Sequence, residues 1–183
     1  MVIYRYILVV TAFIILNGAV NAEEVEDEIL EKATNYIVAK EWGKAYTQLK
    51  NYKGDSSELN LLWGFWYSAE DNPKQNKLAA VKHFEKSASE GDLDAQLVLV
   101  GLYLFTKDPV YVNYSRGVDL SKNLLPKYLE LIESGEDEEG EISLIVGKFY
   151  MFGVGVEKDI SKGREYVEKA AKMGNEEALE IIN

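Results

Sequence analysis

The chain has 183 residues and a strong excess of acidic side chains, 31 against 20 basic ones, which gives a net charge of −11 at neutral pH. Nucleic-acid binding depends on basic patches that displace counterions from phosphates, so this charge argues against a nucleic-acid partner. With no cysteine and a single histidine, the chain offers no thiolate nucleophile and no imidazole or thiolate metal site, and we expect no metal and no cofactor.

The first 22 residues are typical of a secretory signal peptide. Arg5 precedes an apolar run over residues 7–16, and the segment ends in Val20, Asn21 and Ala22, where a signal peptidase reads small residues. An uncleaved anchor is the alternative, but the run is shorter than the ~20 apolar residues that span a bilayer. We expect cleavage after Ala22, export to the periplasm or beyond, and no stable membrane insertion. Cleavage leaves 19 basic and 31 acidic residues, a net charge near −12.

Residues 23–58 predict a helix hairpin that caps the rest of the fold. An acidic helix is expected over residues 25–39, and a second over residues 42–52 that ends at Lys53 and Gly54. The spacing of Trp42, Ala45 and Leu49 places three apolar side chains on one face of this second helix.

Three later segments share one spacing of a tyrosine, a capping residue, a small residue and a glycine. Two of them have identical intervals of nine, four and eleven residues: Tyr67, Asn76, Ala80, Gly91 and Tyr150, Asp159, Gly163, Gly174. The middle segment is stretched to ten, four and eighteen residues: Tyr103, Asn113, Gly117, Gly135. A repeat at a period of roughly 20 to 50 residues indicates a stacked solenoid rather than a single active-site loop.

Each position in this spacing has a structural reason. Asparagine or aspartate caps a helix start because its side-chain oxygen accepts the unpaired amides of the first turn. A small residue one turn later lets the new helix approach its neighbour, and the closing glycine suits a left-handed helix end. The stretch before each tyrosine has apolar residues one turn apart, as in Ala95, Leu99 and Tyr103, so each unit predicts a helix hairpin.

These units resemble the Sel1-like repeats, which are similar to tetratricopeptide repeats. Residues 142–178 carry the best copy, with Gly147, Tyr150, Gly153, Gly155, Val156, Asp159, Tyr166, Lys169, Ala170, Ala171 and Gly174. The copy at 59–95 lacks the glycine loop, and in the copy at 95–139 Gly101 is one place out of register. The resemblance implies an all-α, right-handed solenoid of about nine helices, with repeats at 59–94, 95–138 and 139–178 and a half repeat over 175–182 that covers the last apolar face.

The stretched middle unit departs most from this pattern. Its second helix contains Pro126, which predicts a kink or a break near Leu125 because proline removes a backbone hydrogen bond. Its loop places Tyr111 and Tyr114 where the other pattern has glycines. Two readings stay open, drift in a tolerant loop or a protrusion specific to a partner.

Other features that suggest catalysis have simpler structural explanations. The single histidine, His83, aligns with Tyr166, so a helix-packing position is expected. The glycines of 153–156 come with no lysine, no serine or threonine and no preceding strand, so they do not form a phosphate loop. The acidic runs at 23–28 and 136–140 lack the alternating ligands of a calcium loop. We therefore expect a protein that is not an enzyme.

The first helices of a helical solenoid line its concave face, and those of this chain are rich in aromatic residues. The stretch 61–67 is apolar all round, so Phe65 and Trp66, with Phe149 at the place matching Trp66, could form exposed anchors. The alternative is that the amino-terminal hairpin buries them. With the loop residues Tyr111 and Tyr114, they are the candidate partner-binding residues.

Export, small size and acidity favour a protein-binding function. The resemblance implies an immunity protein that neutralises an exported basic toxin, such as a type VI secretion effector. The alternative is a periplasmic adaptor that assembles several proteins. A weaker alternative is a hydrolase like the cysteine-rich members of the family, whose disulfide-linked repeats this chain lacks.

Overall fold

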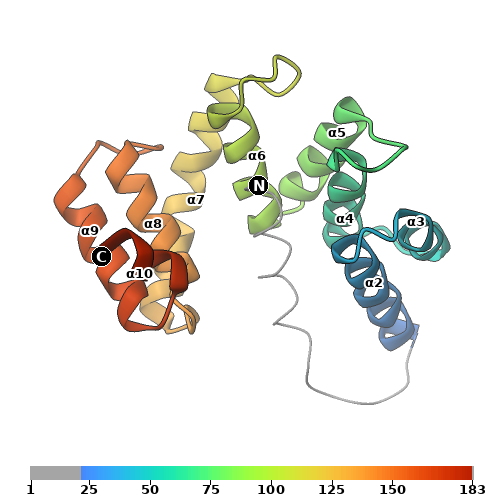
Figure 1. Cartoon of the computed structure of the whole chain (residues 1–183), viewed down its shortest axis with the longest axis horizontal. Helices are drawn as coiled ribbons and strands as arrows, with labels where there is room; N and C mark the ends of the chain where they lie inside the picture. Colours follow the sequence, from blue (N-terminus) through green and yellow to red (C-terminus); the bar gives the residue numbers. More distant parts are fainter. Residues whose placement is uncertain (1–21, 183) are drawn as a thin grey trace. The chain divides into compact units, whose positions relative to one another are not determined.

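The computed structural model describes residues 22–182, and all the regular structure in this range is α-helical (Figure 1). The nine helices in this range are α2 (Ala22–Val38), α3 (Trp42–Asn51), α4 (Ser57–Ser68), α5 (Lys77–Ser89), α6 (Leu93–Phe105), α7 (Tyr114–Ser134), α8 (Glu141–Phe152), α9 (Ile160–Lys172) and α10 (Glu176–Ile182). The all-α solenoid of hairpins predicted from the sequence is confirmed for these residues. The predicted signal peptide lies outside them, except for Ala22.

The chain forms two compact units that divide within α6. The amino-terminal unit runs to Leu99 and includes the loop residues 106–112. The carboxy-terminal unit contains residues 100–105 and continues from Asn113. The acidic excess is the same in both: 16 acidic and 10 basic residues in the described part of the first unit, and 15 and 9 in the second.

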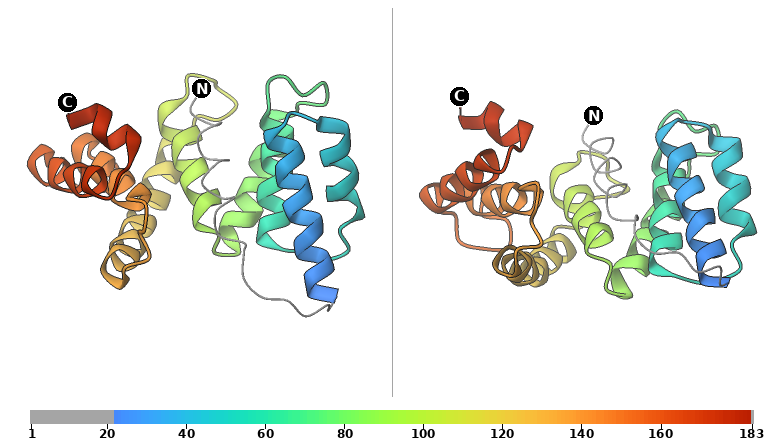
Figure 2. Two further views of the ribbon diagram at one scale, coloured as in Figure 1. Left: turned by 60° about the horizontal axis from the view of Figure 1, so that its bottom comes forward. Right: turned by 90° about the horizontal axis from the view of Figure 1, so that it is seen from below.

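Two hairpins, α2/α3 and α4/α5, build the amino-terminal unit. Figure 2 shows α2, α3 and α4 lying side by side, as their packing contacts require. Apolar residues one turn apart on α2 and α3 face this interior, and burying such side chains is the main favourable term of folding. The buried members are Leu30, Ala33, Ile37, Ala45 and Leu49, and Leu61 of α4 is buried with them. The two helices expected over residues 25–39 and 42–52 are observed as α2 and α3.

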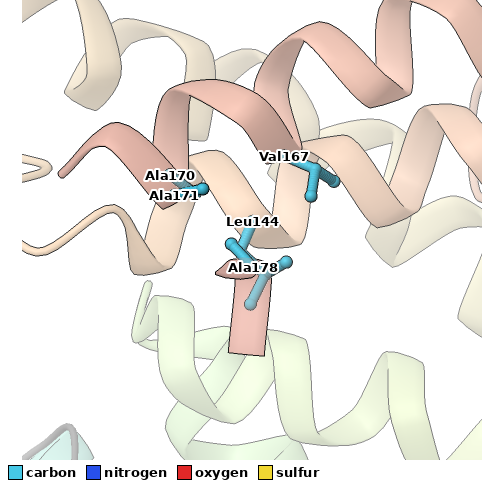
Figure 3. Close-up of a cluster of buried hydrophobic side chains, with 5 residues drawn as sticks. All are labelled: Leu144, Val167, Ala170, Ala171 and Ala178. Carbon is cyan, nitrogen blue, oxygen red and sulfur yellow. The ribbon is translucent and has the colours of Figure 1, made fainter. Parts of the chain in front are cut away.

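In the carboxy-terminal unit, small residues bring α8, α9 and α10 into close contact. Leu144, Val167, Ala170, Ala171 and Ala178 form its buried cluster (Figure 3). A Cβ atom on Gly163 would lie 2.4 Å from Cγ of Met151 and 2.7 Å from the carbonyl oxygen of Gly147. The backbones of α8 and α9 therefore nearly touch, and the predicted need for a small residue at position 163 is confirmed.

The predicted helix starts and ends are confirmed at all three repeats. The side-chain oxygens of Asn76, Asn113 and Asp159 accept the backbone amides of residues three positions later, at 3.1, 3.2 and 2.9 Å. The closing glycines Gly91, Gly135 and Gly174 have φ of 100°, 87° and 95°. These angles lie in the left-handed region that glycine adopts without steric cost.

The break expected near Pro126 does not occur. Helix α7 runs without interruption from Tyr114 to Ser134 with Pro126 inside it. Proline at this place removes the amide that would bond to the carbonyl of Lys122, and both residues are exposed. Water can therefore satisfy the unpaired carbonyl, while Leu124, Leu125 and Tyr128 remain buried and hold the helix.

Candidate interaction surfaces

The aromatic residues predicted as exposed anchors on the first helices lie in the interior. Phe65, Trp66 and Phe149 are all buried, and only 3 % of Trp66 is exposed. The indole Nε1 of Trp66 donates a hydrogen bond to the carbonyl oxygen of Trp42 at 2.9 Å. The exposed-anchor prediction is therefore wrong for the free chain. The alternative, burial by the amino-terminal hairpin, is observed for Trp66, whereas the Phe65 ring packs edge-on against Phe84 of α5.

The two loop tyrosines have opposite environments. Tyr111 is buried on the amino-terminal unit, and its backbone amide donates to the carbonyl oxygen of Asp108 at 3.0 Å. The carboxylate of Asp108 pairs with the ammonium of Lys77 at 2.5 Å, which fastens the loop to the start of α5. Burial raises the pKa of the Tyr111 hydroxyl to about 12. Tyr114, by contrast, is largely exposed at the start of α7, so only one of the two can meet a partner directly.

Four exposed apolar side chains gather at the loop ends of two hairpins in the carboxy-terminal unit. Each hairpin presents one from the last residue of its first helix and one from the first residue of its second helix. We name these four the apolar edge: Phe105, Tyr114, Phe152 and Ile160, with 62, 62, 66 and 51 % of each residue exposed. The two hairpins share this placement, whereas α4/α5 has Ser68 and Lys77 at the corresponding helix ends.

The α8/α9 loop brings its part of this edge towards α7. Gly153 and Gly155 have φ of 72° and 69°, which turns the chain sharply after Phe152. A Cβ atom on Gly155 would lie 2.5 Å from Oγ of Ser121, so the loop is packed on α7. Ser121 and Tyr114 are seven residues apart, which places them on the same side of α7, roughly 10 Å apart along the helix. The loop that follows Phe152 is thus held against the same helix that begins with Tyr114.

A second surface, which we name the aromatic platform, lies on the amino-terminal unit. It consists of Trp63 and Tyr67 on α4 and His83 on α5, all partly exposed. The ring centroids are 5.6 Å apart for Tyr67 and His83, 5.7 Å for Trp63 and Tyr67, and 6.1 Å for Trp63 and His83. The three ring planes lie within 29° of one another. Tyr46 of α3 borders the platform, with its ring edge-on to Trp63.

The imidazole of His83 is oriented by an amide. Nδ1 lies 3.1 Å from Oδ1 of Asn60, whose Nδ2 donates to the carbonyl oxygen of Ser56 at 2.9 Å and to Asp55 at 3.2 Å. This assignment makes the amide oxygen an acceptor, so Nδ1 carries the proton of the neutral ring. Burial, and secondarily the charge of Lys86, lowers the pKa of His83 below its ordinary value.

The carboxy-terminal unit contains the counterpart of this stack. Tyr150 and Tyr166 stack with ring centroids 5.8 Å apart and an interplanar angle of 5°. The prediction that His83 takes the packing position of Tyr166 is therefore confirmed. In this unit, however, the ammonium of Lys162 lies over the Tyr150 ring, 4.2 Å from its centroid.

Comparison with protein families identifies two Sel1 repeats in the chain, at residues 60–92 and 145–175. These coincide with hairpins α4/α5 and α8/α9, and no match covers the stretched middle unit. No curated protein matches the chain. The Sel1 repeats indicate a protein–protein interaction module.

Residues 22–182 contain no group of three or more histidine, aspartate or glutamate side chains placed to hold a metal ion. No helix in the same range combines the length and the apolar character needed to cross a bilayer.

The sequence analysis identified Tyr114 as a candidate but missed the rest of the apolar edge and the aromatic platform. The signal for the apolar edge is the apolar residue two places after the repeat tyrosine, together with the one directly after the capping residue. The signal for the platform is Trp63, one turn before Tyr67, since a helix face already filled by Leu61 and Phe65 does not need it.

Proposed function

We propose that the chain is an exported immunity protein that binds and neutralises one basic toxin in the bacterial envelope, such as a type VI secretion effector, and that it has no enzymatic activity. The observation that carries the proposal is the apolar edge of the carboxy-terminal unit. Each of these four side chains is more than half exposed, and large exposed apolar side chains support a binding role where they form a patch.

The edge and the charge have separate tasks in such a complex. Burying an exposed aromatic side chain contributes about 1.5 to 3 kcal/mol, and aromatic residues are frequent binding hot spots. The net charge of −11 attracts a basic partner over a longer distance and speeds its encounter. We therefore expect the association rate to fall with salt, whereas the dissociation rate depends on Phe152 and Tyr114.

The experiment is titration calorimetry of the chain from Glu23 onward against the product of the neighbouring gene. Replacing Phe152 by serine should weaken binding roughly tenfold, and adding Tyr114→Ser should weaken it further. Leu78→Ser is the matched control, because Leu78 is 65 % exposed but belongs to the amino-terminal unit.

Three results would count against this proposal. Absence of binding by the wild-type chain contradicts the inhibitor and favours the adaptor, as does weak binding to several envelope proteins. Equal binding by Phe152→Ser and Leu78→Ser removes the apolar edge from the interface.

A further inference from the structure

We propose that the aromatic platform of the amino-terminal unit, formed by Trp63, Tyr67 and His83, binds a cationic side chain, arginine or lysine, of the protein partner. This inference rests on the proposed function for the existence of a basic partner and names the chemistry by which that partner is held. The site itself is argued from the two matched hairpins.

The hairpins α4/α5 and α8/α9 share the register of the hydrogen bonds that set the start of their second helices. The backbone amides of Asn76 and Asp159 donate to the carbonyl oxygens of Tyr67 and Tyr150, in both cases at 2.9 Å. The residue whose amide binds the capping side chain is Ala79 in the first hairpin and Lys162 in the second. Ala79 and Lys162 therefore occupy equivalent places, one turn before His83 and Tyr166.

In the carboxy-terminal unit, the stack of aromatic rings already holds a cation. The ammonium of Lys162 lies 4.2 Å from the centroid of the Tyr150 ring, within the ~6 Å over which an aromatic face attracts a cation. In the amino-terminal unit, Ala79 offers only a methyl group at this place. The platform thus presents the ring arrangement that binds an ammonium group without the side chain that supplies one.

The platform is also the larger of the two ring surfaces. Trp63 extends the Tyr67 and His83 pair, whereas Val146 stands at the matching place in the other hairpin and is buried. Tryptophan is the best partner for a cation among the aromatic side chains. The basic residue that acts on His83, Lys86, is paired with both carboxylate oxygens of Asp55 at 2.6 Å, so its charge is compensated. The unit as a whole is acidic and attracts cations.

The experiment uses a fluorescently labelled tetra-arginine peptide as the probe, and the matching tetra-citrulline peptide as its uncharged counterpart. Binding to the chain from Glu23 onward is measured by fluorescence anisotropy. We expect the arginine peptide to bind more tightly than the citrulline peptide. Ala79→Lys copies Lys162 and should place the protein's own ammonium group over the platform. It should weaken the binding of the arginine peptide by about 2- to 30-fold, the range expected for a cation–aromatic contact.

Matched variants separate the platform from the general charge of the protein. Ser89→Lys adds the same charge at an exposed place on α5 and should change binding far less than Ala79→Lys. Trp63→Val, which installs the residue of the other hairpin, should weaken binding as Ala79→Lys does. Lys162→Ala should uncover the Tyr150 and Tyr166 stack and raise the number of bound peptides from about one to two.

Two results overturn the platform as a cation site. One is an equal effect of Ala79→Lys and Ser89→Lys on binding, and the other is equal binding of the arginine and citrulline peptides. The proposed inhibitor fails separately, when the neighbouring gene product does not bind although the arginine peptide does. If the gene product binds but the arginine peptide shows no preference, the platform alone is overturned.

Discussion

In hairpin α4/α5 the second helix meets the first through Ala80 and Phe84, whereas in α8/α9 the same two places hold Gly163 and Val167. A Cβ atom on Gly64 would lie 2.4 Å from the Phe84 ring, so glycine on α4 makes room for a large side chain. In the other hairpin, glycines on both helices, Gly147 and Gly163, allow the two backbones themselves to approach. In α4/α5 the ring of Phe84 fills the space between the two helices, whereas in α8/α9 the two helix backbones approach until little space remains.

The two hairpins differ in the same way in their aromatic stacks. The first puts tryptophan and histidine beside Tyr67, and the second pairs two tyrosines and adds Lys162. The second helices of the two hairpins start and end alike, with the same capping bond and the same left-handed glycine, although their side chains differ. The repeat therefore fixes where side chains lie and leaves their chemistry free to vary.

The largest expected change in stability comes from truncating a buried aromatic residue of the first hairpin. Trp66→Ala should reduce the free energy of unfolding by about 3 to 5 kcal/mol, because it leaves a large cavity and removes the hydrogen bond to the carbonyl oxygen of Trp42. Phe149→Ala, its match in the second hairpin, should cost a similar amount. Urea titration followed by circular dichroism measures both. If Trp66→Ala leaves stability unchanged but weakens binding to the partner, Trp66 belongs to the interface after all.

The next effect tests how each hairpin handles the space between its helices. Gly163→Ala should destabilise by about 1 to 3 kcal/mol, since the added methyl group meets the α8 backbone at Gly147 and Met151 as well as the Met151 side chain, and the backbone cannot move aside cheaply. The reverse change, Ala80→Gly, should cost about 1 kcal/mol through lower helix propensity. Guanidinium titration of both variants is the measurement. A neutral or stabilising Gly163→Ala would mean that α8 and α9 do not approach as closely as described.

Local rules explain how much of this fold could be predicted from the sequence. Capping residues such as Asn76 and Asp159 and closing glycines such as Gly91 act within one turn, so reading their spacing was sufficient. The burial of Trp66 depends on where α3 lies, 24 residues away in sequence, which no local spacing determines. The sequence alone therefore predicts Trp66 as an exposed anchor, whereas the structure buries it.

The candidate surfaces were harder to find for a different physical reason. Amphipathic patterns identify the buried face of a helix, but Phe152 and Ile160 lie at helix ends, where the pattern carries little weight.

The continuity of α7 through Pro126 also depends on tertiary packing. A solvent-facing proline is tolerated there because the neighbouring turns are held by burial.

A smaller effect distinguishes histidine from tyrosine in the two stacks. The folded-state pKa of His83 is lowered, so the unfolded chain binds more protons between that value and about 6.5. The contribution of His83 to stability is therefore fully present above pH ~6.5 and is lost as the pH falls through the folded-state pKa. His83→Tyr, which installs the residue of the second hairpin, should flatten the pH dependence of urea midpoints between pH 5 and 7. An unchanged slope in this variant would assign the dependence to other groups.

The smallest effect concerns the cation that one hairpin has and the other lacks. Lys162→Ala should destabilise the second hairpin by about 0.5 to 1 kcal/mol, the usual value of a cation–aromatic contact at a partly exposed site. Ala79→Lys should stabilise the first hairpin by a similar amount if its ammonium reaches the Tyr67 ring, and Ala79→Met is the control for the added aliphatic chain. Thermal unfolding at low and high salt measures both changes. Because Tyr67 and Tyr150 hold the same place in their hairpins, the two effects should be of opposite sign and comparable size. If Ala79→Met stabilises the hairpin as much as Ala79→Lys, the first stack gains from contact area alone. The two aromatic surfaces would then share their ring geometry but not their ability to bind a cation.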